Sequence, residues 1–119
     1  LAIEVVVGPE ALTGSTRLKA GTAQKLILNM ISTATMVGIG KVYQNLMVDV
    51  MQTNEKLHVR GENIVMEATG VDRETAKNTI SLANGSVKTA ITMILAHCDL
   101  AEATRRLEQA RGHIRQAIM

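Results

Sequence analysis

The chain has 119 residues and a formal net charge of +2, with 46% hydrophobic and 20% charged residues. This balance is typical of a globular protein and not of a disordered one. Tyr43 is the single Phe, Tyr or Trp residue, which leaves almost nothing for base stacking, so we expect no nucleic-acid binding. Cys98 is the single cysteine, which excludes an internal disulfide and predicts a reducing, cytoplasmic location.

The N-terminal part predicts a strand followed by a long helix. Residues 3–7 (IEVVV) form a continuous apolar run, typical of a strand in a sheet covered on both faces. Without neighbouring strands we expect it to be frayed or paired with another chain. A helix should begin near Ser15 or Thr16 and end around Val37. Its apolar residues surround the axis, which predicts burial on nearly all sides. The apolar run 26–40 is too short and too polar to span a membrane.

The middle of the chain predicts a connector and then a helix. Residues 41–50 favour an extended connector with some strand character. Thr53 or Asn54 should cap a helix that runs to about Thr69 and ends at Gly70. Gly61 lies inside this helix and indicates either a bend or a close contact.

The C-terminal part predicts three further helices with clear caps. Asp72 should cap a helix over 73–83, Ser86 one over 87–98, and Asp99 a final helix over 100–119, with Glu102 in a capping-box position. Alternating spacings of three and four place six apolar residues on one stripe of the final helix. The stripe is a packing surface, either for the chain's own helices or for a partner helix: Leu100, Ala103, Leu107, Ala110, Ile114 and Ala117.

The stretch Gly8–Lys25 is the candidate binding segment. It combines three glycines, four hydroxyls, the carboxylate of Glu10 and three cations between a predicted strand and a predicted helix. That arrangement exposes backbone N–H groups to an anion, and the hydroxyls and cations favour a phosphate ester. The alternative is an ordinary turn with a hydroxyl cap and solvated cations.

The sequence gives little indication of a metal site, a catalytic triad, a nucleotide-binding motif or a reactive cysteine. His58, His97 and His113 lie on separate predicted helices with no second His or Cys one turn away, so we predict no metal site. No catalytic Ser-His-Asp order, P-loop or dinucleotide motif is present. The setting of Cys98 predicts a buried, unreactive side chain at a helix end.

The sequence of residues 8–25, GPE-x-LTGSTRLKAGTAQK, closely resembles the signature of the N-acetylmuramic acid 6-phosphate etherases and of the related glucokinase regulatory proteins. Both families belong to the SIS phosphosugar-binding group. The resemblance continues through residues 40–43, 45–50 and 53–57. It implies a mainly α C-terminal fragment of a longer protein. Residues 1–52 would be one strand, one long helix and a connector from the edge of an α/β SIS domain. Residues 53–119 would form a helical domain, with a three-helix unit over 62–98 that resembles a ubiquitin-associated fold without ubiquitin binding, and the final helix.

The resemblance also implies a function. The parent would be a carbon–oxygen lyase that splits the D-lactyl ether of its substrate in cell-wall recycling, giving N-acetylglucosamine 6-phosphate and D-lactate. It would act without a cofactor or metal, as a homodimer. The acid/base glutamates would lie before Leu1, so this chain alone should be inactive. Neighbouring cations should lower the pKa of Glu10. The residues expected to meet the phosphorylated amino sugar are Glu10, Ser15, Thr16, Arg17 and Lys19. Two alternatives stay open: a non-catalytic phosphosugar-binding regulatory module and a helical dimerisation domain.

Overall fold

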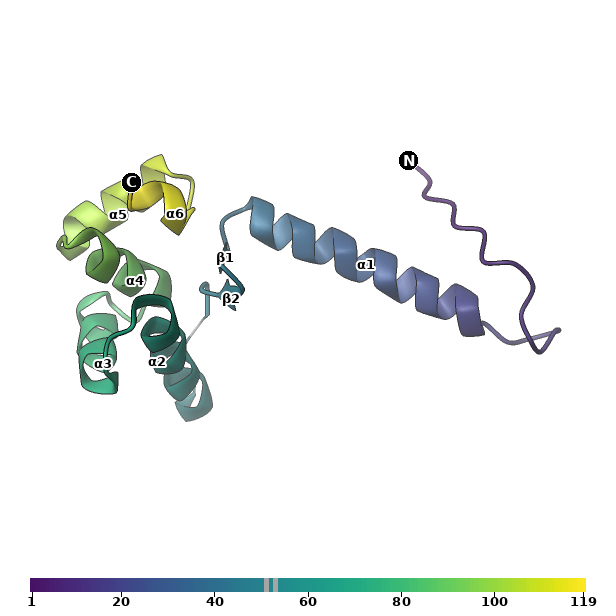
Figure 1. The fold of residues 1–119 in the computed structure, drawn as a ribbon, viewed down its shortest axis with the longest axis horizontal. Helices are drawn as coiled ribbons and strands as arrows, with labels where there is room; N and C mark the ends of the chain where they lie inside the picture. Colours follow the sequence, from purple (N-terminus) through teal and green to yellow (C-terminus); the bar gives the residue numbers. More distant parts are fainter. Residues whose placement is uncertain (51, 53) are drawn as a thin grey trace. The chain divides into compact units, whose positions relative to one another are not determined.

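The computed structural model describes residues 1–50, 52 and 54–119. The chain divides into two compact units, Leu1–Thr35 and Met36–Met119. Helix α1 (Leu18–Gly38) begins in the first unit and ends in the second (Figure 1). The fold is mainly helical, as predicted, and each unit is described by itself.

The first unit consists of an extended segment, a loop and most of α1. Residues 3–7, predicted as a strand that would fray without neighbouring strands, belong to no sheet. A strand needs a second backbone to receive its N–H and C=O groups, and the described residues of this unit provide none. Ile3 and Val5 instead share a hollow of about 220 Å³ with residues of α1 such as Ala23 and Ile27.

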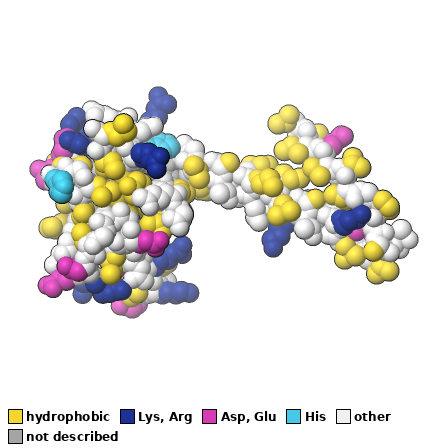
Figure 2. Space-filling model, in the orientation of Figure 1, with side chains coloured by type: hydrophobic (Ala, Val, Ile, Leu, Met, Phe, Trp, Pro, Cys, Tyr) yellow, Lys and Arg dark blue, Asp and Glu magenta, His cyan; other side chains and the backbone are white. Residues whose placement is uncertain are grey.

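Helix α1 begins later than predicted and is not buried. Its first intrahelical bond runs from the Gly21 N–H to the Arg17 carbonyl at 3.2 Å, so neither Ser15 nor Thr16 is the cap. No residue of α1 inside its bounds is buried. Leu26 and Met30, for example, are 51% and 65% exposed, and apolar side chains gather on the surface of this unit (Figure 2). The prediction of burial is therefore wrong for this chain, because the first unit has too few elements to cover a helix that is apolar all round.

The second unit begins with a short β-hairpin. Strands β1 (Val42–Tyr43) and β2 (Leu46–Met47) are antiparallel, with Val42 opposite Met47 and Tyr43 opposite Leu46. A turn with Gln44 at a φ of 54° joins them. The strand character predicted for 41–50 is confirmed.

Helix α2 (Glu55–Thr69) has the predicted caps. The Leu57 N–H donates to the Asn54 side chain at 3.0 Å, and Gly70 closes the helix in the left-handed conformation. The alternative cap, Thr53, lies outside the described residues. A side chain at Gly61 would collide with the Gln52 amide and would come within 3.0 Å of Val87 Cγ2, so Gly61 marks a close contact.

Helices α2, α3 (Arg73–Leu82) and α4 (Val87–Ala96) pack against one another in the second unit (Figure 1). Asp72 and Ser86 accept cap hydrogen bonds from the N–H groups of Thr75 and Thr89, as predicted. The core of the second unit is aliphatic: Leu46, Val48, Ile64, Val65, Ala76, Ile80, Ala83, Val87, Ala90, Ile91, Leu107, Ala110, Ile114 and Ala117.

The predicted single helix over 100–119 is wrong. The chain forms α5 (Leu100–Gln109) and a short α6 (Ile114–Ala117), separated by a turn in which Arg111 and Gly112 have φ values of 50° and 81°. The Gly112 N–H closes α5 on the Leu107 carbonyl at 2.7 Å, a typical helix-ending bond. Five members of the apolar stripe are nevertheless buried, because α5 and α6 both pack against α4. The structure thus favours packing of the stripe onto the chain's own helices.

The turn between α5 and α6 lies against the end of α1. Gly40 has a φ of 74°, and a Cβ on it would lie 2.7 Å from the carbonyl carbon and oxygen of Gly112. His113 Nε2 lies 3.2 Å from the Gly38 carbonyl oxygen. Two glycine backbones therefore touch where a side chain on Gly40 would not fit.

Within the described part of the chain, every helix is too short or too polar to cross a membrane.

Candidate functional site

The loop before α1 is closed by the side chain of Glu10. The backbone N–H of Lys19 donates to Glu10 Oε2 at 3.0 Å, and that of Ala20 donates to Oε1 at 3.1 Å. These N–H groups belong to the first turn of α1 and have no partner inside the helix. The residue at the cap position, Arg17, has no side-chain acceptor. The carboxylate of Glu10 therefore caps α1 from across the loop.

The residues inside this closed loop form an open hollow. Its volume is about 490 Å³, and its lining residues are Glu10, Leu12, Thr13, Gly14, Ser15, Thr16 and Arg17. The Thr16 hydroxyl donates to the Leu12 carbonyl within the loop. Gly14 has a φ of 117°, a conformation that L side chains rarely adopt. Exposed hydroxyls and one guanidinium thus surround a shallow space beside an anionic carboxylate.

The backbone N–H group of Lys19, and next that of Ala20, hold the pKa of Glu10 below its usual range. The positive charge of Lys19 adds a smaller effect of the same sign. The predicted direction is confirmed, but its main cause is the helix N-terminus, because two amide donors face the carboxylate directly.

The structure brings four of the five predicted site residues together around the hollow, and the fifth lies beside it. Glu10, Ser15, Thr16 and Arg17 line the hollow. The Lys19 ammonium instead lies 3.7 Å from where a Cβ of Gly8 would stand, and Lys19 lines a neighbouring apolar depression with Leu18 and Leu26.

A second polar cluster lies on α5 and was missed from the sequence. Glu102 accepts from Arg105 at 2.7 and 2.8 Å and from Arg106 Nε at 2.7 Å. Arg105 and then Arg106 hold the pKa of Glu102 at about 2. The spacing of three and four along one helix is the signal that predicts such pairs.

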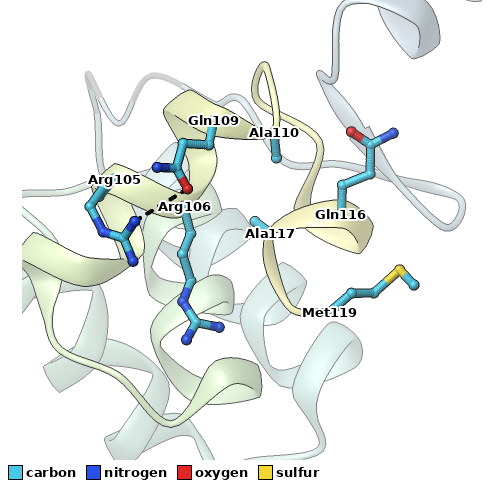
Figure 3. A pocket seen from close by; sticks show the side chains of 7 residues that line it. All are labelled: Arg105, Arg106, Gln109, Ala110, Gln116, Ala117 and Met119. Carbon is cyan, nitrogen blue, oxygen red and sulfur yellow. Dashed lines mark hydrogen bonds between the residues drawn. The ribbon is translucent and has the colours of Figure 1, made fainter.

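The two arginines line a hollow of about 440 Å³ between α5 and α6, shown in Figure 3. Arg105 also donates to the Gln109 side chain at 3.3 Å. Gln116 and Met119 lie on the opposite side, with two small alanines at the bottom. Because Glu102 already pairs with both guanidinium groups, the positive charge facing this hollow is partly neutralised.

A third hollow, of about 500 Å³, lies along α2 and α3, and its lining includes Glu55, His58, Glu62 and Lys77. Gln52 also lines it. Its amide nitrogen is buried and has no hydrogen-bond partner among the described residues. Arg73 pairs with Glu62 at 2.7 Å.

The remaining candidate groups do not form a site. Among the residues that the structure describes, no three His, Cys, Asp or Glu side chains are grouped to hold a metal ion. Cys98 is only partly buried, so the prediction of a buried thiol is wrong. Desolvation nevertheless raises its pKa and disfavours a reactive thiolate.

The comparisons with known proteins agree with the resemblance in the loop. No family model matches the chain. An N-acetylmuramic acid 6-phosphate etherase of an Exiguobacterium species is 64% identical over 116 residues, which are 98% of this chain and 40% of the relative. The etherase of Oceanobacillus iheyensis is 63% identical over 116 residues, with the same coverage of both chains. That of a Geobacillus species is 62% identical over 118 residues, 99% of this chain and 40% of the relative.

The chain is homologous to the N-acetylmuramic acid 6-phosphate etherases. The predicted family resemblance is thereby confirmed over nearly the whole chain. The chain spans about 40% of the length of the curated etherases that it matches.

Proposed function

We propose that this chain is part of an N-acetylmuramic acid 6-phosphate etherase and carries one portion of its sugar-phosphate site. The observation that carries the proposal is an identity of 62–64% to etherases over 98–99% of the chain. The hollow beside α1 supports it, because hydroxyls and a guanidinium are donors that suit a phosphate ester.

The reaction we propose for the parent protein is elimination followed by hydration. A base removes the proton on the carbon next to the ring-opened aldehyde, an acid protonates the departing lactyl oxygen, and water then adds to the double bond. Two carboxylates with separated pKa values suit these roles. We assign them to the part of the parent that this chain does not contain.

The contribution of this chain is binding. In our proposal Ser15 and Thr16 donate hydroxyl hydrogen bonds to the sugar phosphate, and Arg17 and Lys19 supply positive charge. Glu10 belongs to the same loop. The exposed apolar side chains of α1 support its packing against an SIS sheet and a second subunit in a homodimer. We also propose a cytoplasmic location and a UBA-like three-helix unit that packs without binding ubiquitin.

A chimera tests this proposal. The matching region of the Exiguobacterium etherase is replaced by this chain, and lactate release from N-acetylmuramic acid 6-phosphate is measured. We expect the chimera to retain activity within about tenfold of the parent, and Arg17→Ala in the chimera to raise KM. The isolated chain should release no lactate. A folded chimera without lactate release, beside an active Exiguobacterium parent, contradicts the proposal.

A further inference from the structure

The first turn of α1 is already occupied by an anion of the chain itself. A helix N-terminus presents free N–H groups and a partial positive charge, and it therefore attracts phosphate groups. Here the two N–H groups of Lys19 and Ala20 point at the two oxygens of Glu10, at 3.0 and 3.1 Å. One carboxylate thus satisfies two of the first-turn donors that an incoming phosphate would use.

The same two bonds fix the loop between them. Glu10 stands at one end of the loop and α1 at the other, so the bonds close residues 11–18 into a ring. The hydrogen bond from Thr16 to the Leu12 carbonyl crosses that ring and narrows it further. Ser15 and Arg17 line the hollow inside it. The position of these donors therefore depends on the Glu10 side chain.

The N-terminus of α1 can hold the Glu10 carboxylate or a phosphate, but not both, because the two groups carry charge of the same sign. The pKa of Glu10 is lowered by the amide groups it faces, so the carboxylate is ionised at neutral pH. A phosphate placed on the same amides would meet this negative charge at close range. It is therefore directed to the loop hydroxyls and to Arg17, away from the first turn of α1.

We propose that Glu10 is a positioning residue of the phosphosugar site: it caps α1, holds the loop 11–17 closed, and keeps the phosphate off the helix N-terminus. The identity of the ligand in this inference rests on the proposed function. The closure of the loop rests only on the two hydrogen bonds to Glu10.

The first experiment uses the whole chain, labelled with ¹⁵N, and inorganic phosphate as the probe. In the wild type, phosphate should leave the amide resonances of Lys19 and Ala20 unchanged. In Glu10→Ala both amides are freed, and phosphate should shift them. Glu4→Ala, which removes an exposed carboxylate of the same segment, is the matched control and should behave as the wild type. The proposal is overturned if phosphate shifts the resonances of both amides in the wild type. It is also overturned if phosphate shifts neither resonance in Glu10→Ala.

The second experiment uses the active chimera. Glu10→Ala should raise KM for the sugar phosphate by about tenfold with a smaller change in kcat, because the donors that bind the phosphate lose their positions. Glu10→Gln keeps one acceptor oxygen and should restore part of this loss. A fall of kcat by about tenfold with unchanged KM contradicts the positioning role. An inactive wild-type chimera refutes the proposed function, and the phosphate titration then still decides whether Glu10 shields the helix end.

Discussion

Replacing Gly40 with alanine tests the contact between the end of α1 and the turn after α5. Gly40 has a φ of 74°, and its Cβ would stand 2.7 Å from two backbone atoms of Gly112 and 3.1 Å from the His113 nitrogen. Backbone atoms cannot rotate away as a side chain does. The turn must move, and it leads directly into α6, whose first residue Ile114 is 1% exposed.

Two costs add in Gly40→Ala. A left-handed conformation costs an L residue about 1–2 kcal/mol. Forcing an extra carbon into a packed contact costs about 1–3 kcal/mol. We therefore expect the free energy of unfolding of the second unit to fall by about 2–5 kcal/mol.

The assay is urea unfolding followed by the fluorescence of Tyr43, which lies in β1 of the same unit. Gly70→Ala is the control, because Gly70 has a φ of 77° but no atom within 4 Å of its Cβ position. It should lose only the conformational part, about 1–2 kcal/mol. Equal losses in the two variants would show that the contact between the two glycines contributes nothing, and the reasoning would then be wrong.

Three further predictions concern the second unit. Ile91→Ala, at a side chain that is 0% exposed, should cost about 2–5 kcal/mol in urea unfolding, whereas Leu82→Ala, at one that is 66% exposed, should cost well under 1 kcal/mol. Asn54→Ala removes the cap of α2 and should cost about 1 kcal/mol, with loss of amide protection confined to its first turn by hydrogen exchange. Glu102 has a pKa of about 2 against an ordinary 4.5, so its ion pairs stabilise the fold fully above pH 4.5. The stability difference between the wild type and Glu102→Gln should shrink as the pH falls from 4.5 towards 2. Glu108→Gln, an exposed change on the same helix, is the matched control.

The features that could be predicted from the sequence are those that depend on residues close together along the chain. Helix caps depend on one side chain and an amide three residues later, and the caps at Asn54, Asp72, Ser86 and Asp99 are all present. The strand character of residues 41–50 was also predictable, because it depends on the residue types within that segment. The loop that precedes α1 was recognisable because its hydroxyls, glycines and cations follow one another along the chain.

The failed predictions depend on contacts between distant parts. The break after α5 is a partial exception: Gly112 ends the helix through a local bond to the Leu107 carbonyl, and it was missed because the apolar spacing continues past it. Only its packing against Gly40 is a distant contact. The predicted strand and the burial of α1 both required partners that the described residues do not provide. The cap of α1 was misplaced because its acceptor, Glu10, stands on the far side of the loop.

The aliphatic core has a spectroscopic consequence. Tyr43 is the single Phe, Tyr or Trp residue of the chain, and it packs beside the buried cluster, opposite Leu46. A methyl group that touches this ring should therefore have its proton resonance moved upfield, and the imidazole rings of the three histidines shift neighbouring resonances less. A single displaced methyl signal would report whether the hairpin is seated on the helices, without a label and without a second probe.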